Sequence, residues 1–478
     1  MDQNNQQTIS NLTEEQMNEE QLKAKARALS MKEVTGYGVM DGFGLRYLAP
    51  YVIEIGKNNP NLNTYVGLLT SLPSLLGSLS MLLTLKVMGK VSRKKIVCWS
   101  IFLQGLMWLP LILMGYFFYY HGLNSDLTLT SLVIIYTMLI IFGGFAGPVW
   151  SSWIKDLVSK DVGNYFGKRT KIAGFVALIG LLMAGFILDY FKGSKVFFGF
   201  IILFTLAFLG RMISVIYLTK EYEPKFKPQK ESYFSFLDFV KKMWFNNYGK
   251  FVIYYALVSL TLTIASPFFA VYILKELNLG YIAYMAIIIS PAITGFLFMT
   301  GLGKFTDSYG NINLIKICGY LTPALPFLWL ISFFIYPISP TATIVYLVII
   351  EAIGGLVWAG FNLSANNFIY EAVTKERIAI CVSYFNVING IGVFIGPLIG
   401  GILASRLPTT LGLSALLIVF IISGISRFAV SFYMIPKIKE VRKVKKFGFK
   451  EVRESVTNLS LMDFVEYLEI NLLKTRPV

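Results

Sequence analysis

The sequence predicts an all-α integral membrane protein, with twelve transmembrane helices in two pseudo-symmetric six-helix bundles. Three observations predict this fold: long apolar runs, basic residues in alternate loops, and a duplication within the chain. The 478 residues are 55% hydrophobic and 15% charged, with a mean hydropathy of +0.62. A soluble domain carries about 25% charged residues, and one aqueous globule cannot hide so much apolar surface. The composition therefore excludes a water-soluble enzyme.

Runs of about 20 apolar residues are the length that a helix needs to cross a bilayer. Twelve such runs occur. Because the number is even, both tails are expected on the same side of the membrane. They are expected near residues 36–56, 64–88, 96–119, 129–150, 172–191, 196–218, 251–274, 281–302, 313–336, 342–364, 380–404 and 409–435.

Lys and Arg set the predicted orientation. Twenty-one lie in the loops that follow even-numbered runs, and the opposite loops hold five: Lys57, Lys192, Lys195, Lys275 and Arg406. Cytoplasmic loops of membrane proteins carry this excess. Both termini are therefore expected in the cytoplasm of a multi-pass cell-membrane protein. The net charge of +16 is interpreted in the same way and not as a nucleic-acid site.

The longest connection divides six runs from six. The expected organisation is an N-terminal cytoplasmic tail (1–34), a first six-helix bundle (35–218), a central loop with an interfacial helix (219–250), a second bundle (251–436) and a basic C-terminal tail (437–478). The interfacial helix is indicated by a stretch of apolar residues that Lys241 and Lys242 interrupt. This helix and the basic C-terminal tail are both expected to contact anionic lipid headgroups. Cys98, Cys318 and Cys381 indicate no disulfide framework.

The two halves repeat each other. Residues 153–161 resemble residues 368–376, so that Asp156 and Glu371 correspond at an offset of 215, and Arg211 and Arg427 correspond at 216. The loop 303–310, with Asp307, corresponds to a loop at Gly89 at an offset of 218. Parallel repeats imply two halves related by an axis along the membrane normal.

The 303–310 loop carries the residues of a known family. Its sequence, Gly303-Lys-Phe-Thr-Asp307-Ser-Tyr-Gly310, resembles the G-x-x-x-D-x-x-G loop of the major facilitator superfamily, while the loop at Gly89 has lost the glycines and the aspartate. The resemblance covers residues from about 35 to 436. It implies a secondary transporter, without indicating the solute.

The same resemblance implies a cytoplasmic gate. In this family the loop aspartate is thought to pair with an arginine of the other half, close to an acid; the matching residues here are Asp307, Arg169 and Glu371, with Asp156 as the repeat equivalent of Glu371. The position 215 beyond Arg169 is Tyr384, so one gate pair is lost as a unit and the other is kept. Alternatively, Asp307 only caps a turn and Arg169 only obeys the orientation rule.

Polar residues inside the runs are candidates for a solute or proton cavity. Arg46 lies about 15 Å from either end of its run, too deep to reach water by bending outward. Asp41 lies about 140° away around an α-helix, so the partner of Arg46 is expected elsewhere. The family architecture places the first, fourth, seventh and tenth runs around the cavity, with Glu351 as a carboxylate for protonation or pairing, and Asn362, Tyr254 and Tyr255 as polar lining. A permanent bridge from Arg46 to Glu351 or Asp41 is the structural alternative.

Arg211 and Arg427 lie close enough to the cytoplasmic ends of their runs to reach the interface, so a structural role is expected for them. The sequence has no G-x-x-x-x-G-K-[ST] loop, and its one histidine, His121, cannot build a triad or an H-E-x-x-H site. ATP, a cofactor, a metal and an enzymatic activity are therefore not expected.

These residues favour a secondary active transporter that moves a small solute, anionic or carboxyl-bearing because of Arg46, by rocking two bundles with a proton or counter-solute. The rival hypothesis is a non-transporting sensor or assembly subunit on the same scaffold, which the lost loop at Gly89 keeps open. The solute, the direction of movement and the oligomeric state stay open.

Overall fold

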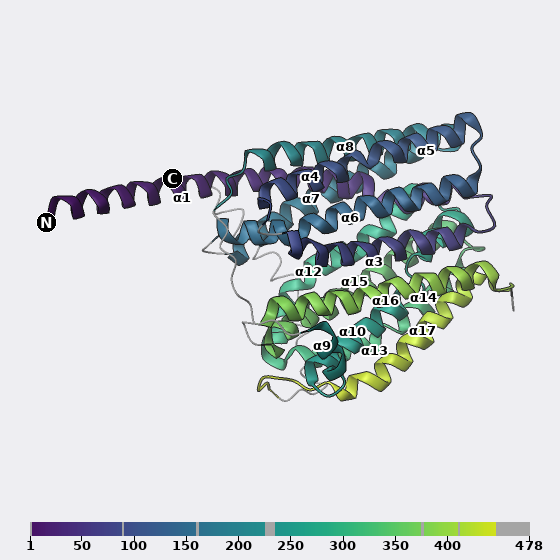
Figure 1. Cartoon of the computed structure of the whole chain (residues 1–478). Coiled ribbons are helices and arrows are strands. Elements are labelled where there is room, and N and C mark those ends of the chain that lie inside the picture. The colour runs from purple at the N-terminus through teal and green to yellow at the C-terminus, as the bar shows by residue number, and fades with distance from the viewer. Residues whose placement is uncertain are drawn as a thin grey trace, which may run out of the picture. The chain divides into compact units, whose positions relative to one another are not determined.

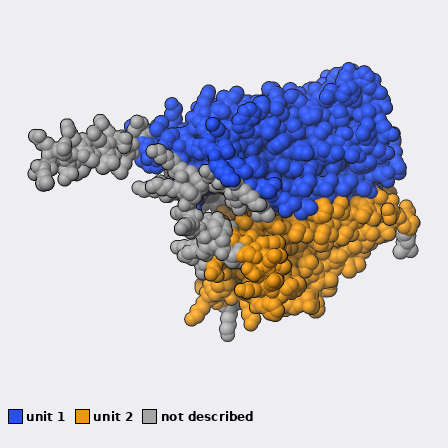
Figure 2. Space-filling view, in the orientation of Figure 1, with its two compact units in different colours: residues 1–230, 267–282 blue, residues 231–266, 283–478 orange. Residues whose placement is uncertain are grey.

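The computed structural model describes residues 2–87, 90–158, 162–224, 235–373, 377–409 and 412–445. Every regular element in these ranges is helical (Figure 1). The chain divides into two compact units, coloured in Figure 2: unit 1 contains residues 1–230 and 267–282, and unit 2 contains residues 231–266 and 283–478. The first boundary falls inside the predicted central loop, and the segment 267–282 belongs to the unit that precedes it in sequence.

Unit 1 is built from a broken first helix, five further membrane-length segments and the segment 267–282. Helix α6 packs against α3 and α4, while α1 packs against α7 and α8 (Figure 1). Its elements are α1 (Asp2–Val39), η1 (Met40–Gly44), η2 (Leu45–Tyr47), α2 (Leu48–Ile55), α3 (Leu62–Val87), α4 (Arg93–Leu106), α5 (Trp108–His121), α6 (Ser125–Leu157), α7 (Val162–Tyr190), η3 (Gly193–Lys195), α8 (Val196–Lys220), α11 (Phe268–Val271) and η4 (Tyr272–Glu276).

Unit 2 repeats this kind of packing with α10 against α16 and α17, and α15 against α13 and α14. Its core is a cluster of buried aromatic and aliphatic side chains around Phe251, Phe361 and Phe368. Its elements are α9 (Phe236–Lys242), α10 (Asn247–Thr263), α12 (Gly280–Tyr309, entering from unit 1), α13 (Asn311–Leu321), α14 (Ala324–Ile335), α15 (Pro340–Ala372), α16 (Ile378–Arg406), α17 (Ala415–Met434) and η6 (Ile435–Lys437).

Ten segments of the described residues are long and apolar enough to cross a membrane, and they coincide with ten of the twelve predicted runs. The other two predicted runs are also helical but are not among these ten segments. Residues 36–56 are divided among α1, η1, η2 and α2, and residues 64–88 coincide with α3 as far as Val87. Proline stands inside α3, α6, α12 and α16, at Pro73, Pro148, Pro291 and Pro397. Neighbouring helices and Ser or Thr side chains can satisfy the backbone groups that a proline frees inside a membrane protein.

The structure supports the duplication with contacts that the sequence comparison missed. In unit 1 the Glu223 carboxylate accepts a hydrogen bond from the backbone N–H of Arg93 at 2.8 Å; in unit 2 the Glu440 carboxylate accepts one from the N–H of Ile312 at 2.9 Å. In each unit a glutamate that follows the last helix therefore binds the start of an earlier helix, where free N–H groups favour negative charge.

Two buried arginines repeat as well. Arg211 Nε donates to Gln104 Oε1 at 2.8 Å, and Arg427 Nη1 donates to the Thr322 carbonyl at 3.3 Å, with Thr322 lying 218 residues after Gln104. The expectation that both arginines reach the interface is wrong, because both side chains are buried. Their expected structural role agrees with these contacts, which hold helices together inside each unit.

The expectation of a loop at residues 303–310 is wrong, because α12 continues to Tyr309 and only Gly310 lies outside the helix. The C-terminal segment binds this end of α12. Arg442 donates to the Thr306 carbonyl, the Lys445 N–H donates to the Ser308 carbonyl at 3.3 Å, and Glu440 lies against Gly310. Part of the segment that the sequence assigned to lipid contact therefore contacts protein. Gly310 has φ +92° and ψ 158°, a backbone conformation that is almost restricted to glycine.

Gly310→Ala should lower thermal stability, because the new Cβ would collide with the Glu440 carboxylate and the backbone conformation would cost about 1–3 kcal/mol. Gly303→Ala is the matched control, since a Cβ at Gly303 meets no atom within 4 Å. Apparent Tm in detergent should fall for the Gly310 variant alone. An equal fall in both variants would show that the two glycines are not distinguished by backbone strain.

Candidate functional site

The first membrane helix is broken at the depth where the sequence places Arg46. α1 ends at Val39, a π-helical turn covers Met40–Gly44, a 3-10 turn covers Leu45–Tyr47, and α2 resumes at Leu48. Broken helices at membrane depth place polar backbone and side chains at the solute and ion sites of many transporters. π-helical turns likewise often occur at functional sites.

Within this break, Arg46 and Asp41 form an ion pair. Arg46 Nη2 lies 3.2 Å and Nε lies 3.3 Å from Asp41 Oδ2. The prediction that the two side chains lie apart on the helix is wrong. A π-helical turn bonds residues five apart, as the Leu45 N–H does with the Met40 carbonyl, so it brings Asp41 and Arg46 to one face.

The pair is unequal in exposure: the Arg46 side chain is 53% exposed, and that of Asp41 is 18% exposed. About half of the Arg46 side chain therefore stays exposed while it is bound to Asp41. Beside the break is a cavity of 210 Å³ with a mainly apolar lining, to which Thr70, Ser74 and Tyr136 add hydroxyl groups.

Arg169, predicted for the gate, is bound inside unit 1. Its guanidinium lies 2.5 Å from Glu33 Oε2, donates to the Ser30 carbonyl at 2.6 Å, and stacks over Trp150 at 4.4 Å. Glu33 is 3% exposed and also lies 3.8 Å from Arg211. The sequence analysis missed Glu33. The i, i+4 spacing of Glu33, Tyr37 and Asp41, which places them on one helix face, could have indicated it.

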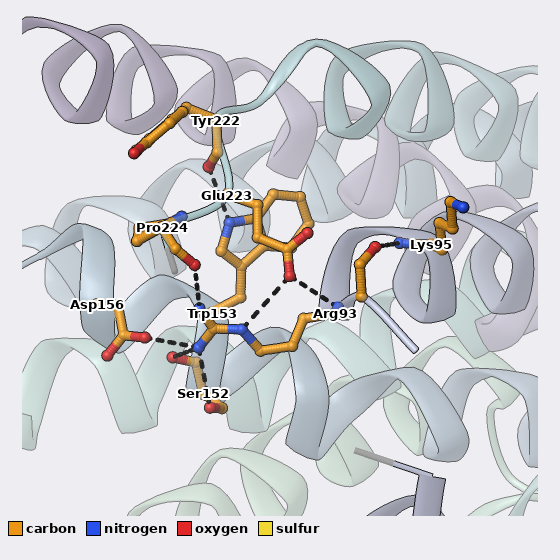
Figure 3. A network of polar contacts seen from close by, with 9 residues as sticks. Arg93, Lys95, Ser152, Trp153, Asp156, Tyr222, Glu223 and Pro224 are labelled. Atoms are coloured by element: carbon orange, nitrogen blue, oxygen red, sulfur yellow. Dashed lines mark hydrogen bonds and ion pairs between the residues drawn. The ribbon is translucent and has the colours of Figure 1, made fainter. Parts of the chain in front are cut away.

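Asp156 takes part in a second network, shown in Figure 3. Its carboxylate lies 2.6 Å from Arg93 Nη1, while Glu223 approaches Arg93 Nε at 3.7 Å from the segment that follows α8. Arg93 is 1% exposed and also donates to the Pro224 carbonyl at 2.9 Å. The indole of Trp153 donates to the Tyr222 carbonyl at 2.9 Å. This network fixes the chain after α8 against α4 and α6.

In unit 2, Arg442 connects the two gate segments, because it binds both the Thr306 carbonyl, next to Asp307, and Glu371. Asp307 is exposed, and among the described residues its carboxylate has no hydrogen-bond or ion-pair partner within its own unit. Glu371 pairs with Arg442 at 3.5 Å. Glu371 and Asp156, which correspond in the repeat, are therefore each bound to an arginine. Gly89 and the residues 159–161 and 374–376 of the repeated segments lie outside the described residues.

The remaining cavity candidates lie in unit 2. Tyr255 donates to Asn362 Oδ1 at 2.9 Å, so the structure brings two predicted residues together. The Tyr255 ring stacks on Phe361 at 5.4 Å. Tyr254 is fully buried in the core, with its hydroxyl beside Gly319. Glu351 accepts a hydrogen bond from Trp329 Nε1 at 3.0 Å, and its pairing with Arg46 stays a prediction.

Comparison with known proteins identifies the family. Residues 37–365 and 251–477 match the Major Facilitator Superfamily. The chain belongs to this superfamily. This confirms the resemblance predicted from the 303–310 loop and the duplicated spans.

Similar proteins agree in being transporters. A multi-drug resistance efflux pump PmrA homolog of Lactococcus lactis subsp. lactis (strain IL1403) is 24% identical over 394 residues, which cover 80% of this chain and 89% of that protein. The crystal structure of the nucleoside transporter NupG has a TM-score of 0.61 at 16% identity, covering 87% of this chain and all of that chain. A bacterial homologue of the iron transporter ferroportin in an inward-facing state has a TM-score of 0.64 at 13% identity, covering 87% and 98%. The chain is therefore a multi-pass membrane protein of a transporter family.

The pair of Arg169 and Glu33 gives a stability prediction. Arg169→Gln removes a positive charge that neutralises the buried Glu33 carboxylate. Breaking a buried ion pair in this way lowers the free energy of unfolding by about 3–5 kcal/mol. Apparent Tm should fall clearly. The double variant Glu33→Gln/Arg169→Gln should lose less than the sum of the two single variants, because the bond between these two side chains is then lost only once, while Arg211 keeps its bond to Gln104. Additive losses would contradict a direct interaction.

Proposed function

We propose that the protein is a proton-coupled secondary transporter of a small anionic or carboxyl-bearing solute, and that it works by alternating access. The observation that carries this proposal is the ion pair of Asp41 and half-exposed Arg46 in the broken first helix. An arginine at mid-depth costs about 2.5–3.5 kcal/mol even on insertion scales, so a residue kept there has a partner or a ligand. Arg46 has Asp41 as its partner in the present conformation, and about half of its side chain is exposed.

The coupling follows from competition for one cation. While Asp41 is ionised it neutralises Arg46, and a solute carboxylate must displace it. Protonation of Asp41 removes that competitor, so that the proton and the anionic solute each favour the binding of the other. Proton and solute would then cross the membrane together. This scheme needs only the two residues and the chemistry of their charges.

The alternation would depend on contacts at both ends of the units. At the predicted outer end, within unit 1, the Asp189 carboxylate accepts from the N–H groups of Tyr281 and Ile282 at 3.1 and 3.3 Å, and Tyr281 donates to Glu54 at 3.2 Å. A cavity of 460 Å³ lies beside these contacts. We propose that they close the outer side and break when that side opens.

At the predicted cytoplasmic end we propose a latch, defined as the ion pair of Asp307 with Arg169. Two observations support the latch. Asp307 is exposed, and Arg169 has an acid partner, Glu33, that belongs to its own unit and that it could exchange for Asp307. Arg169 would exchange Glu33 for Asp307 when the cytoplasmic side closes. Because an acid is present in either state, the arginine never loses its counter-charge.

The transport test uses the full chain in liposomes with an imposed pH gradient and a panel of carboxylate and other small solutes. A solute should produce a proton flux, and Arg46→Ala should reduce that flux at least ~10-fold, the loss expected when a hydrogen bond to a charged group is removed. Arg406→Ala, an exposed arginine at the end of α16, is the matched control. Undiminished flux in Arg46→Ala would refute the cavity, and no flux with any solute would favour the sensor or assembly subunit.

The latch predicts that Asp307→Asn shifts the population away from the outward-open state. In a cysteine-free background, a single cysteine replacing exposed Thr170, beside Arg169, should react faster with a thiol reagent on the cytoplasmic side. Asp238→Asn removes an exposed acid from α9 and should leave the rate unchanged. Equal rates in the two variants would refute the latch.

A further inference from the structure

Glu221, the residue after α8, is a buried acid with unsatisfied oxygens. Its side chain is 0% exposed, and neither carboxylate oxygen has a hydrogen-bond partner among the described residues. The backbone on both sides is fixed: Lys94 Nζ donates to the Glu221 carbonyl at 2.8 Å, and Trp153 Nε1 donates to the Tyr222 carbonyl at 2.9 Å. The side chain is therefore held inside the unit, where an ionised carboxylate is costly.

The charged and titratable groups near Glu221 come from α1, α4 and α7 and from its own segment. They are Glu33 from α1, Lys94 and Cys98 from α4, Tyr165 and Arg169 from α7, and Glu223 from its own segment. From α6, Trp150 and Trp153 belong to the same apolar cluster as Tyr222, and Asp156 is bound to Arg93.

The cations of this group are already engaged. Arg169 is bound to Glu33 and Ser30, and Lys94 is bound to the Glu221 carbonyl and not to its carboxylate. Burial, with a further contribution from the negative charge of Glu33, raises the pKa of Glu221 from 4.5 to about 8. At neutral pH the carboxyl therefore carries a proton, whereas an exposed glutamic acid would not.

We propose that Glu221 is a reversible proton-binding site of unit 1, and that its ionisation competes with Asp307 for Arg169. On ionisation the O–H bond of the carboxyl breaks, the proton passes to water, and the carboxylate adds a second negative charge beside Arg169. Glu33 and Glu221 together then hold Arg169 within unit 1. When Glu221 is protonated, Arg169 is freer to leave. The competition with Asp307 rests on the proposed latch, whereas the proton site does not.

Infrared difference spectroscopy of the full chain in lipid vesicles tests the proton site. Between pH ~6 and pH ~10, the carbonyl stretching band of a protonated carboxyl should disappear with a midpoint near the pKa of about 8, and Glu221→Gln should remove that component. Asp238→Asn, which changes an exposed acid of α9, should leave it in place. Identical titrations of the wild type and Glu221→Gln would overturn the proposal.

A second measurement needs no variant. A hydrophobic carbodiimide modifies protonated carboxyls in apolar surroundings, so peptide mass spectrometry of the wild type should find Glu221 labelled, with labelling that falls as the pH rises through ~8. Absence of labelling, or labelling independent of pH, would overturn the proton site.

Linkage gives the sign of the stability effect. The folded chain binds this proton more tightly than the unfolded chain, so the contribution of Glu221 to stability is largest below the unfolded pKa of 4.5 and is lost as the pH rises to about 8. Apparent Tm of Glu221→Gln should fall less over this interval than that of the wild type. Parallel curves would contradict the assignment.

The coupling to Arg169 has its own readout. The thiolate is the reacting species, so the rate of the cysteine at position 170 is first corrected for the ionisation of its own thiol. The corrected rate should rise as the pH passes ~8, and Glu221→Gln should remove that rise. If Glu221 titrates in the infrared while the corrected rate stays independent of pH, the competition for Arg169 is refuted and the proton site stands.

Discussion

The structure depends on one constraint, which is the cost of holding a charge away from water without a partner. Arg93, Arg211 and Arg427 are buried, and each is bound by an acid, an amide or backbone carbonyls from other helices. These bonds join segments that are distant in sequence, so they help to define how the helices of each unit pack. Glu221 departs from the pattern, because it is buried and its carboxylate oxygens have no hydrogen bond among the described residues.

The same constraint connects packing with the proposed transport cycle. A buried charge cannot be left alone during a conformational change, so a moving cation must exchange one acid for another. Arg169 has Glu33 in the present state and would have Asp307 in the other; Arg46 has Asp41 and would have the solute. In this scheme the energy of a step is a difference between two ion pairs, which is small enough for a proton or a solute to reverse.

Helix breaks provide the geometry for these exchanges. The π-helical turn at Met40–Gly44 turns Arg46 toward Asp41, and the chain between α10 and α11 leaves the helix at residues 264–267, where unit 2 gives way to the segment that belongs to unit 1. Both breaks occur in the middle of apolar runs that the sequence presents as single spans. Such local changes of winding are tolerated inside a membrane protein where neighbouring helices and polar side chains satisfy the freed backbone groups.

Sequence alone determined the class of the protein. Hydropathy, loop charge and an internal repeat with an offset of 215–218 residues can all be recognised along the chain without any knowledge of contacts. It also identified Arg46, Asp41, Arg169 and Asp307 as charges that require an explanation. Only the tertiary structure decided their partners within each unit. Pairing depends on the local helical winding, which brought Asp41 to Arg46, and on segments far away in the chain, which brought Glu33 to Arg169 and Arg442 to Glu371. The burial of Glu221 was decided in the same way, because a glutamate just beyond an apolar run is ordinarily expected in water, and here the folded unit leaves none of its surface exposed.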